Sequence, residues 1–310
     1  MSRAEIGCCD ATECCPTNAS LPSMIFSKPP SLVGRRVLIT GAARGIGAAL
    51  ARRLQERGAL VALVGLEPDQ LAAVAGSCGR APWEVCDVGD RGQVDRAVGR
   101  VVEALGGLDV VVANAGIAAQ LPLVGGNPDV MERILRVNVL GVYNTIRAAG
   151  PHISHERGYA LIVSSVAAAV HLPLMGAYSA SKAAAEALGN TLRIELRPSG
   201  AKVGVAYFAE LDTDMTHRGF ATAAAAQLPA AKRFIHVTPL ETGIDGLERG
   251  IARRARRIIV PWWTAGAIPF RTMLQPFVDR ITQPNLARAL QTARGEDAPL
   301  TTPQPDLPDE

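Results

Sequence analysis

The sequence predicts an α/β protein with helices on both faces of a parallel sheet, and three observations carry this prediction. From Arg36 onward, short β-branched runs alternate with longer amphipathic segments. This alternation favours a parallel sheet, because parallel strands need long crossover connections. The strand runs are apolar almost throughout, which is typical of strands buried on both faces. A chain of 310 residues, 48% of them apolar, is long enough for one large domain of three α/β/α layers.

The expected elements follow in order along the chain. The strands are RVLIT at 36–40, LVALVG at 60–65, WEVC at 83–86, LDVVVA at 108–113, ALIVSS at 160–165 and KVGVAYF at 202–208. The helices between them are expected at 45–57, 68–76, 90–105, 128–149 and 176–197. After Phe208 the alternation breaks: a loop with a short helix is expected first, followed by a helix at 240–255 and a short strand near RIIVP at 257–261.

Changes of composition divide the chain into four predicted regions. Residues 1–33 are polar and contain several prolines, so we expect a disordered leader before a single α/β domain at 34–262. Residues 263–294 are expected to form a C-terminal helical extension that acts as a lid. The last segment, GEDAPLTTPQPDLPDE at 295–310, predicts a disordered acidic tail. Neither end has apolar periodicity, so we expect residues 1–30 and the tail from residue 295 to be removable without loss of fold or activity.

The composition argues against several classes of protein. The formal net charge is only +3, and the basic cluster RGIARRARR at 249–257 is typical of a helical face, so nucleic-acid binding is not expected. No apolar run reaches the roughly 18–20 residues that span a bilayer. The N-terminus contains acids and lacks the apolar core of a secretory signal. These features favour a cytoplasmic protein.

Four of the six cysteines lie in the leader, at Cys8, Cys9, Cys14 and Cys15. Their CC-x4-CC pattern could bind a soft metal, but vicinal pairs differ from the C-x2-C spacing of zinc sites. We expect reduced thiols in a disordered leader and no metal site, which also fits the cytoplasm.

The segment TGAARGIG at 40–47 joins the first strand directly to the first helix. Gly41 permits a tight turn, Gly45 lets the backbone approach a pyrophosphate, and Gly47 allows the helix to pack closely on the strand. The free N–H groups and the dipole of that helix then face the anion. A glycine-rich turn without a ligand is the alternative. The position at the start of the sheet favours a phosphate loop in a Rossmann-like fold.

The segment GAYSASKAAAEAL places Tyr178 four residues before Lys182 in an expected helix. Residues four apart share a helix face, so the phenol and the ammonium can approach each other. A free tyrosine has a pKa near ~10, and a neighbouring cation lowers that pKa toward neutrality. On its own the pair has an alternative interpretation as a solvated surface pair.

Six signals occur together in one order: TGAARGIG, Asp87 after the third strand, NAG at 114–116, Asn138 in RVNVLG, the serines 164–165, and YSASK at 178–182. In order and spacing they resemble the short-chain dehydrogenase/reductase family of the TGxxxGxG, NAG and YxxxK type, over roughly residues 34–215. The resemblance implies an NAD(P)(H)-dependent oxidoreductase that interconverts a ketone or aldehyde and its alcohol by hydride transfer.

The resemblance also implies a catalytic role for four side chains. Tyr178 would be the general acid/base, with its pKa lowered by Lys182 and by the oxidised nicotinamide. Lys182 would also hold the ribose hydroxyls. Ser165, thirteen residues before Tyr178, would hydrogen-bond the substrate oxygen, with Ser164 as the competing choice. Asn138 would order a water that links Lys182 to solvent, its alternative being an ordinary buried amide.

The resemblance also implies a set of residues that bind the cofactor. Asn114, Ala115 and Gly116 would support the sheet edge and the adenosine ribose, while Asp87 and Val88 would contact the adenine. Thr213 would contact the nicotinamide carboxamide. The family usually has Pro-Gly before it, whereas Phe208 and Ala209 stand here. The full set of expected cofactor-binding residues is Gly41, Arg44, Gly45, Ile46, Gly47, Gly65, Leu66, Asp87, Val88, Asn114, Ala115, Gly116, Tyr178, Lys182 and Thr213.

The choice between NADP(H) and NAD(H) depends on the end of the second strand. A carboxylate there normally takes the ribose hydroxyls of NAD, but the matching position is Gly65. Arg44 is placed where a guanidinium could meet a 2′-phosphate. Leu66 supplies no second basic residue, and Glu67 could turn toward the ribose instead. The sequence favours NADP(H), with NAD(H) as the alternative.

The substrate end involves the 209–240 loop and the region of His171, Leu172, Leu174 and Met175. Both are rich in apolar side chains, so an apolar ketone, aldehyde or secondary alcohol is expected. Candidate partners for a substrate carboxylate are Arg218, Lys232 and Arg233, but loop charges are usually solvated.

Two other functions stay open from the sequence. One is a dinucleotide-binding redox-sensing or scaffold protein, although such proteins usually lose the tyrosine or lysine that this chain keeps. The other is a membrane-surface enzyme acting on lipid-like or steroid-like substrates, anchored through 258–270 beside the basic cluster; a lid or subunit interface is the alternative for that segment. A homodimer or homotetramer through the helices at 128–149 and 176–197 is expected.

Overall fold

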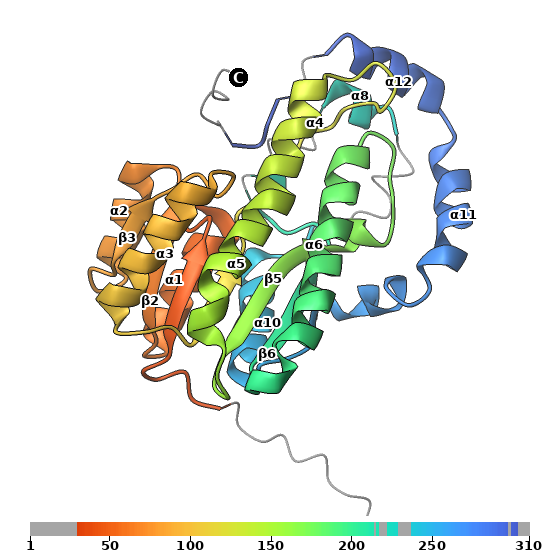
Figure 1. Ribbon diagram of the computed structural model, residues 1–310. Helices are drawn as coiled ribbons and strands as arrows, with labels where there is room; N and C mark the ends of the chain where they lie inside the picture. The colour runs from red at the N-terminus through yellow and green to blue at the C-terminus, as the bar shows by residue number, and fades with distance from the viewer. Residues whose placement is uncertain (1–29, 214, 217–221, 229–236, 297–298, 303–310) are drawn as a thin grey trace, which may run out of the picture.

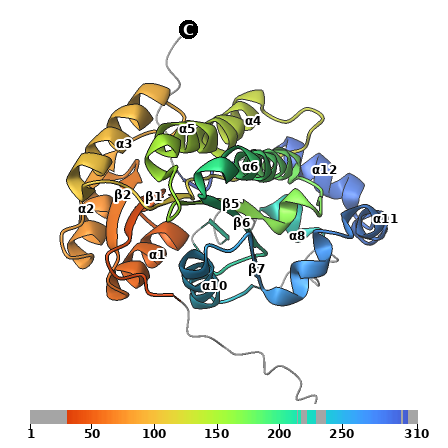
Figure 2. The same cartoon turned by 60° about the horizontal axis from the view of Figure 1, so that its bottom comes forward.

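The computed structural model describes residues 30–213, 215–216, 222–228, 237–296 and 299–302. In this part of the chain a seven-stranded parallel sheet has the order β3-β2-β1-β4-β5-β6-β7. Helices cover both of its faces, so the predicted Rossmann-like, three-layer α/β/α fold is confirmed (Figures 1 and 2). The chain changes direction across the sheet between β1 and β4, which creates a crevice at the carboxyl ends of these strands.

The strands are β1 (Arg36–Thr40), β2 (Leu60–Gly65), β3 (Trp83–Val85), β4 (Val110–Ala113), β5 (Tyr159–Ser165), β6 (Lys202–Phe208) and β7 (Arg257–Val260). The main helices are α1 (Gly45–Glu56), α2 (Pro68–Ser77), α3 (Arg91–Leu105), α4 (Pro128–Leu135), α5 (Gly141–Ile153), α6 (Gly176–Glu195) and α10 (Leu240–Arg253). The C-terminal part holds a 3-10 helix (Trp262–Ala267), α11 (Arg271–Thr282) and α12 (Leu286–Arg294), and a short α8 (Ala223–Ala226) precedes it.

Alternate residues of each strand face two separate hydrophobic cores. Val37 and Ile39 of β1 pack in the core under α1, α2 and α10, whereas Leu38 between them packs under α3, α5 and α6. All three side chains are fully buried. The continuous apolar strand runs of the sequence therefore result from a sheet that is covered on both sides.

The expected helix at 128–149 differs from the observed one. The chain is helical from Pro128 to Ile153, but residues Arg136–Leu140 form a π-helical turn between α4 and α5. Such a turn inserts one residue into the helix and often occurs at functional sites. The helix also continues past Pro151, which lies near its carboxyl end and cannot donate the usual backbone hydrogen bond there.

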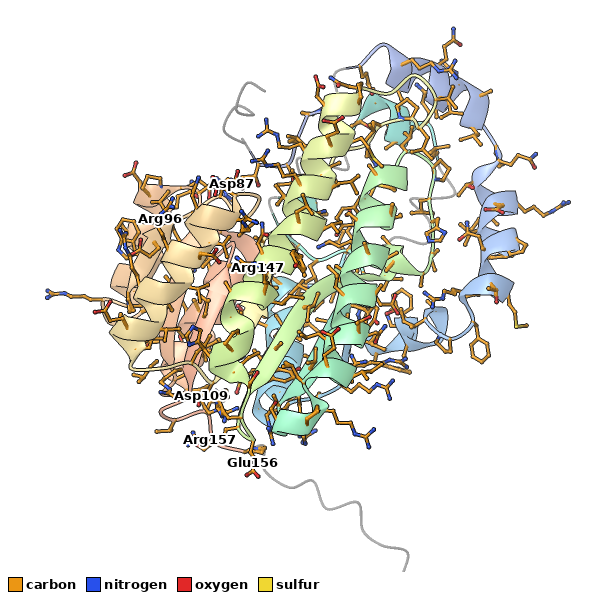
Figure 3. The ribbon with its side chains drawn as sticks, viewed as in Figure 1. Asp87, Arg96, Asp109, Arg147, Glu156 and Arg157 are labelled. Carbon is orange, nitrogen blue, oxygen red and sulfur yellow. The ribbon has the colours of Figure 1, made fainter. Side chains whose placement is uncertain are left out.

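A charged pair joins the amino ends of β1 and β4, far from the crevice. Asp109 accepts hydrogen bonds from the backbone N–H, Nε and Nη2 of Arg36, each at 3.0 Å. These bonds hold the pKa of Asp109 at about 2, below its ordinary value, although burial opposes them. Figure 3 labels Asp109 near one end of the sheet, with Glu156 and Arg157, and Asp87 near the other.

The Asp109→Ala substitution is expected to lower the free energy of unfolding by about 2 kcal/mol, because it removes charge-assisted hydrogen bonds from a buried strand end. In the unaltered protein the folded pKa is depressed, so this stabilisation is complete above the unfolded pKa near 3.8 and is lost as the pH falls toward about 2. Urea unfolding of both proteins between pH 7 and pH 3 measures the difference in their free energies of unfolding. A constant difference across that range would contradict the assignment.

Candidate active site

A cavity of about 1360 Å³ opens at the carboxyl ends of the strands. Fifteen of the residues predicted from the sequence line it: Gly41, Arg44, Gly45, Ile46, Gly65, Leu66, Asp87, Val88, Asn114, Ala115, Gly116, Ser165, Tyr178, Lys182 and Thr213. Two predicted residues, Gly47 and Asn138, do not line the cavity but support residues that do. The structure thus brings the predicted cofactor and catalytic positions into one space.

The phosphate loop is shaped by close backbone approach. Gly41 has a φ of +65°, and a Cβ there would lie 2.8 Å from the Cα of Ala115. A Cβ on Gly47 would lie 2.2 Å from the carbonyl oxygen of Gly41, so only glycine lets α1 start this close to β1. No side chain caps α1, and its first turn contains no acid. Its terminal N–H groups can therefore bind an anion in the cavity.

The loop at 114–121 lies beside the phosphate loop and is held mainly through its backbone. The N–H groups of Asn114 and Ala115 donate to Thr40 Oγ1 at 3.1 and 3.2 Å, and Asn114 Nδ2 donates to the Thr40 carbonyl at 2.9 Å. Further along, the N–H of Leu121 donates to the carbonyl of Leu174 at 2.9 Å. These bonds fix the loop to the end of β1 and to the segment before α6.

Asn138 is fully buried in the π-helical turn and holds the next residue of this loop. Its Oδ1 accepts from the Ile117 N–H at 2.8 Å, and its Nδ2 donates to the Ile117 carbonyl and to Ser181 Oγ, both at 2.9 Å. A Cβ on Gly116 would lie 3.2 Å from both Asn138 Oδ1 and Lys182 Nζ. Asn138 thus sits directly behind the predicted lysine.

Of the two adjacent serines, only Ser165 is directed at Tyr178. Ser165 hydrogen-bonds the Tyr178 phenol, and its Oγ also lies 3.1 Å from the Phe208 carbonyl. Ser164 Oγ instead donates to the backbone carbonyl of Lys182 at 2.8 Å. The geometry supports Ser165 over Ser164, as the thirteen-residue spacing predicts.

The expected lowering of the Tyr178 pKa by Lys182 is not found in the protein alone. Burial raises the pKa of Tyr178 to about 12, and the Ser165 hydrogen bond opposes that rise only in part. Burial also lowers the pKa of Lys182 to about 8. Lys182 Nζ donates to the Val163 carbonyl at 3.1 Å and lies 5.6 Å from the Tyr178 ring centroid. Desolvation, which the spacing of the two residues does not reveal, dominates the pKa values of both groups.

Arg44 and Glu67 form an ion pair at the edge of the cavity, with Arg44 Nη2 2.7 Å from Glu67 Oε1. The Nε of Arg44 is buried and has no hydrogen-bond partner among the described residues. Gly65 also lines this edge, so no strand-end carboxylate occupies it. Glu67 was not among the predicted site residues. It lines the same edge of the cavity as Arg44, with which it pairs.

The other end of the cavity is mainly apolar. Its lining includes Leu172, Met175, Phe208, Leu228, Leu274, Val278 and Ile281. The last three lie on one face of α11, at the spacing of successive helical turns, so this face of α11 forms part of the cavity wall. His171 and Leu174 do not line the cavity; Leu174 packs with Ala224 instead. Arg218, Lys232 and Arg233 lie outside the described residues.

The segment 258–270 keeps exposed aromatic side chains after β7, because Trp262 is 82% exposed and Phe270 is 56% exposed. The basic cluster at 249–257 ends at the amino end of β7, whereas Trp262 follows its carboxyl end. No described helix is long and apolar enough to cross a membrane. The described residues also contain no cluster of His, Cys, Asp and Glu suited to a metal ion, and the leader cysteines lie outside them.

The expected disordered tail from residue 295 is wrong for residues 299–302, which we call the C-terminal strap. Thr301 is 3% exposed, and Thr301 and Thr302 line the cavity. Thr301 Oγ1 accepts from the Ala118 N–H, and the Thr301 N–H donates to the Ala118 carbonyl, both at 3.0 Å. Nothing in the composition of the segment signals this contact, because it depends on one threonine and on backbone groups.

The fold and the site together define a dinucleotide-dependent oxidoreductase: a phosphate loop, a supported loop after β4 and a Ser-Tyr-Lys cluster share one cavity. A family model described as short chain dehydrogenase matches residues 35–224. The chain therefore belongs to the short-chain dehydrogenase/reductase family, as the sequence predicts, and is an NAD(P)-dependent oxidoreductase acting on CH–OH groups.

Individual relatives are moderately similar. A hydroxysteroid 11-beta-dehydrogenase 1-like protein of Gallus gallus is 29% identical over 76% of this chain and 82% of its own length. A glucose 1-dehydrogenase of Gluconobacter oxydans is 36% identical over 55% of this chain and 66% of its own length. A short chain dehydrogenase from Burkholderia cenocepacia, crystallised with NADP, matches with a TM-score of 0.66 and 31% identity. The match covers 97% of that structure's chain and 74% of this chain, so about a quarter of this chain has no counterpart in that structure.

Proposed function

We propose that this chain interconverts an apolar ketone or aldehyde and its alcohol, with Tyr178 as the general acid/base. The observation that carries the proposal is that Ser165, Tyr178 and Lys182 line the same cavity as the phosphate loop, with an apolar wall opposite. The complete catalytic set argues against a purely redox-sensing or scaffold function.

The described side chains each have a task in this proposal. A bound nicotinamide cofactor supplies or accepts the hydride, and the phosphate loop and the 114–121 loop would hold it. The Ser165 hydroxyl, which donates to the Phe208 carbonyl in the structure, would turn to donate a hydrogen bond to the substrate oxygen, while the Tyr178 hydroxyl gives that oxygen a proton or takes one back. The Lys182 ammonium stabilises the phenolate and holds ribose hydroxyls. Asn138 keeps the backbone beside Lys182 in place.

NADP(H) is the cofactor that we propose, because Arg44 lines the cavity next to Gly65. A guanidinium binds a phosphate strongly and often through two hydrogen bonds. Glu67 holds the Arg44 side chain at this edge, and it also places a carboxylate close to the proposed phosphate position. The two side chains should therefore act on the cofactor preference in opposite directions.

The Arg44→Ala variant is expected to lower kcat/KM for NADP(H) at least tenfold and to change that for NAD(H) little, because only NADP(H) carries the extra phosphate. Glu67→Gln should raise the preference for NADP(H), since it removes a neighbouring negative charge. Steady-state kinetics with both cofactors measure the ratio. Equal losses with both cofactors in Arg44→Ala would show that Arg44 does not read the phosphate.

The apolar wall supports an apolar substrate rather than a sugar, although the relatives include proteins named for each. Turnover of NADPH on a carbonyl library, with ketones of increasing apolar size and an equal number of sugars, tests the proposal. A preference for apolar ketones is expected. Activity on sugars alone would refute the substrate class, and no turnover of any carbonyl would refute the reaction.

We also propose that the chain forms a homo-oligomer through α5 and α6. Tyr143 on α5 and Ile194 on α6 are 47% and 74% exposed, which is unusual for large apolar side chains on packed helices. Light scattering in dilute solution tests this, and a monomer would contradict it.

A further inference from the structure

We propose that the C-terminal strap is a working part of the active site and that Thr301 is a positioning residue for the 114–121 loop. This inference rests on the proposed function, because it assigns the strap to that same site. It also concerns residues beyond the matched family model, which ends at residue 224.

The contact between Thr301 and Ala118 has the form of a short two-sided latch. Thr301 uses its own N–H and its hydroxyl oxygen to satisfy both the carbonyl and the N–H of Ala118, each at 3.0 Å. Ala118 is fully buried, so without the strap its two backbone groups would lack these partners. Leaving buried backbone groups unpaired is costly, so the latch stabilises the loop in one position.

The latch acts on the residue next to the one that Asn138 holds. Asn138 binds both backbone groups of Ile117, and Thr301 binds both backbone groups of Ala118. Two consecutive residues of the loop are thus held by hydrogen bonds from two segments that are far apart in the sequence. Because Gly116 lies against Lys182 Nζ, a shift of the loop at Ala118 would be transmitted to the ammonium that serves Tyr178.

The segment before the strap is tied down at several points. Gln275 of α11 pairs with the His171 backbone, accepting from its N–H and donating to its carbonyl, both at 3.0 Å. Ala289 and Ala293 of α12 are buried, and Thr292 Oγ1 accepts from Gln227 Nε2 at 2.7 Å. In Figure 1 α11 runs along one side of the molecule and leads to α12, which lies beside α8. The strap therefore ends a continuous cover over the apolar part of the cavity.

The cover borders both the cavity and the solvent. Leu274, Val278 and Ile281 line the cavity, and so do Met273 and Phe277, although these two residues are 75% and 56% exposed. In addition to the Gln275 contacts, Arg271 Nη1 lies 3.5 Å from Glu186 Oε2. Since α11 and the strap both line the cavity, the latch at Thr301 helps to keep the cover closed over the substrate.

Two truncations and two substitutions test the inference. A chain ending at Glu296 lacks the strap, and a matched chain ending at Thr302 keeps it. Thr301→Val removes the hydroxyl acceptor at nearly constant volume, and Thr301→Ser restores it. The first readout is amide hydrogen exchange of the peptide that covers 114–121. The second is kcat and KM for the best apolar ketone. The melting temperature of each intact variant is measured alongside them.

The chain ending at Glu296 and Thr301→Val are both expected to speed exchange at Ala118 about tenfold or more and to lower kcat/KM by a similar factor. Thr301→Ser and the chain ending at Thr302 should match the unaltered protein in both readouts. Unchanged exchange at 114–121 in Thr301→Val would overturn the latch. Faster exchange with unchanged kcat and KM would overturn its catalytic role.

Exchange does not require a substrate, so the latch is tested even if the proposed reaction fails. If the unaltered protein reduces no carbonyl compound, the proposed function is refuted while the exchange result still decides the contact. If the unaltered protein is active and the chain ending at Glu296 matches it in both readouts, only the inference about the strap is refuted.

Discussion

The Tyr178→Phe variant is expected to lose about 10²- to 10⁴-fold in kcat, the range that general acid–base catalysis contributes, while it still binds NADP(H). The ring stays in place against the apolar residues around it, and only the hydroxyl that exchanges the proton is removed. Because burial raises the pKa of Tyr178 to about 12, the phenol is protonated at neutral pH and is ready to donate a proton. Carbonyl reduction should therefore vary little with pH up to about 8, where Lys182 begins to lose its charge, whereas alcohol oxidation should accelerate as the pH rises toward that value.

Single-turnover kinetics and cofactor fluorescence separate the two effects in this variant. Tyr143→Phe is the matched control, because Tyr143 does not line the cavity and the variant keeps its ring at the proposed subunit contact, so kcat should be unchanged. If Tyr178→Phe kept more than a few per cent of the original kcat, or if oxidation kept its pH dependence, another group would have to move the proton.

The Lys182→Ala variant is expected to lose about tenfold or more in both kcat and cofactor affinity, since one ammonium serves the phenol and the ribose. A pH dependence should accompany this loss. Burial holds the pKa of Lys182 at about 8, so its charge is present below that pH and is lost above it. Cofactor affinity of the unaltered protein should therefore fall above about pH 8, and that of Lys182→Ala should not.

Isothermal titration of NADPH between pH 6 and pH 9 measures this difference. Lys202→Ala is the matched control, because Lys202 lies at the exposed start of β6 and does not line the cavity. A drop in kcat alone, with cofactor affinity preserved in Lys182→Ala, would remove the ribose contact from the assigned role.

Much of this fold could be predicted because its strands carry a strong local signal. The apolar runs at 36–40, 60–65 and 202–208 are bounded by turn residues, and the strands occupy the same residues in the structure. The π-helical turn around Asn138 could not be predicted, since one inserted residue leaves the apolar spacing of the helix almost unchanged.

The candidate site was predictable where function depends on residue types at fixed spacing. The glycines of the phosphate loop and the Tyr178–Lys182 pair belong to this group, and all of the predicted catalytic and cofactor-binding positions except Gly47 and Asn138 line the cavity. The pKa of Tyr178 was not predictable, because burial depends on the whole fold. Thr301 was missed for a related reason: its partner Ala118 lies 183 residues away, and backbone hydrogen bonds leave no mark on the sequence.

The way in which the 114–121 loop is held has a consequence for protein engineering. Its backbone is fixed by Thr40, Asn138, Leu174 and Thr301, which are distant from one another along the chain. A designer who transplants the loop alone into another scaffold would transfer its sequence but none of these supports. Grafting this active-site edge would require all four supporting residues to be moved together, and the new scaffold would also have to accommodate the buried side chains of Ile117 and Ala118.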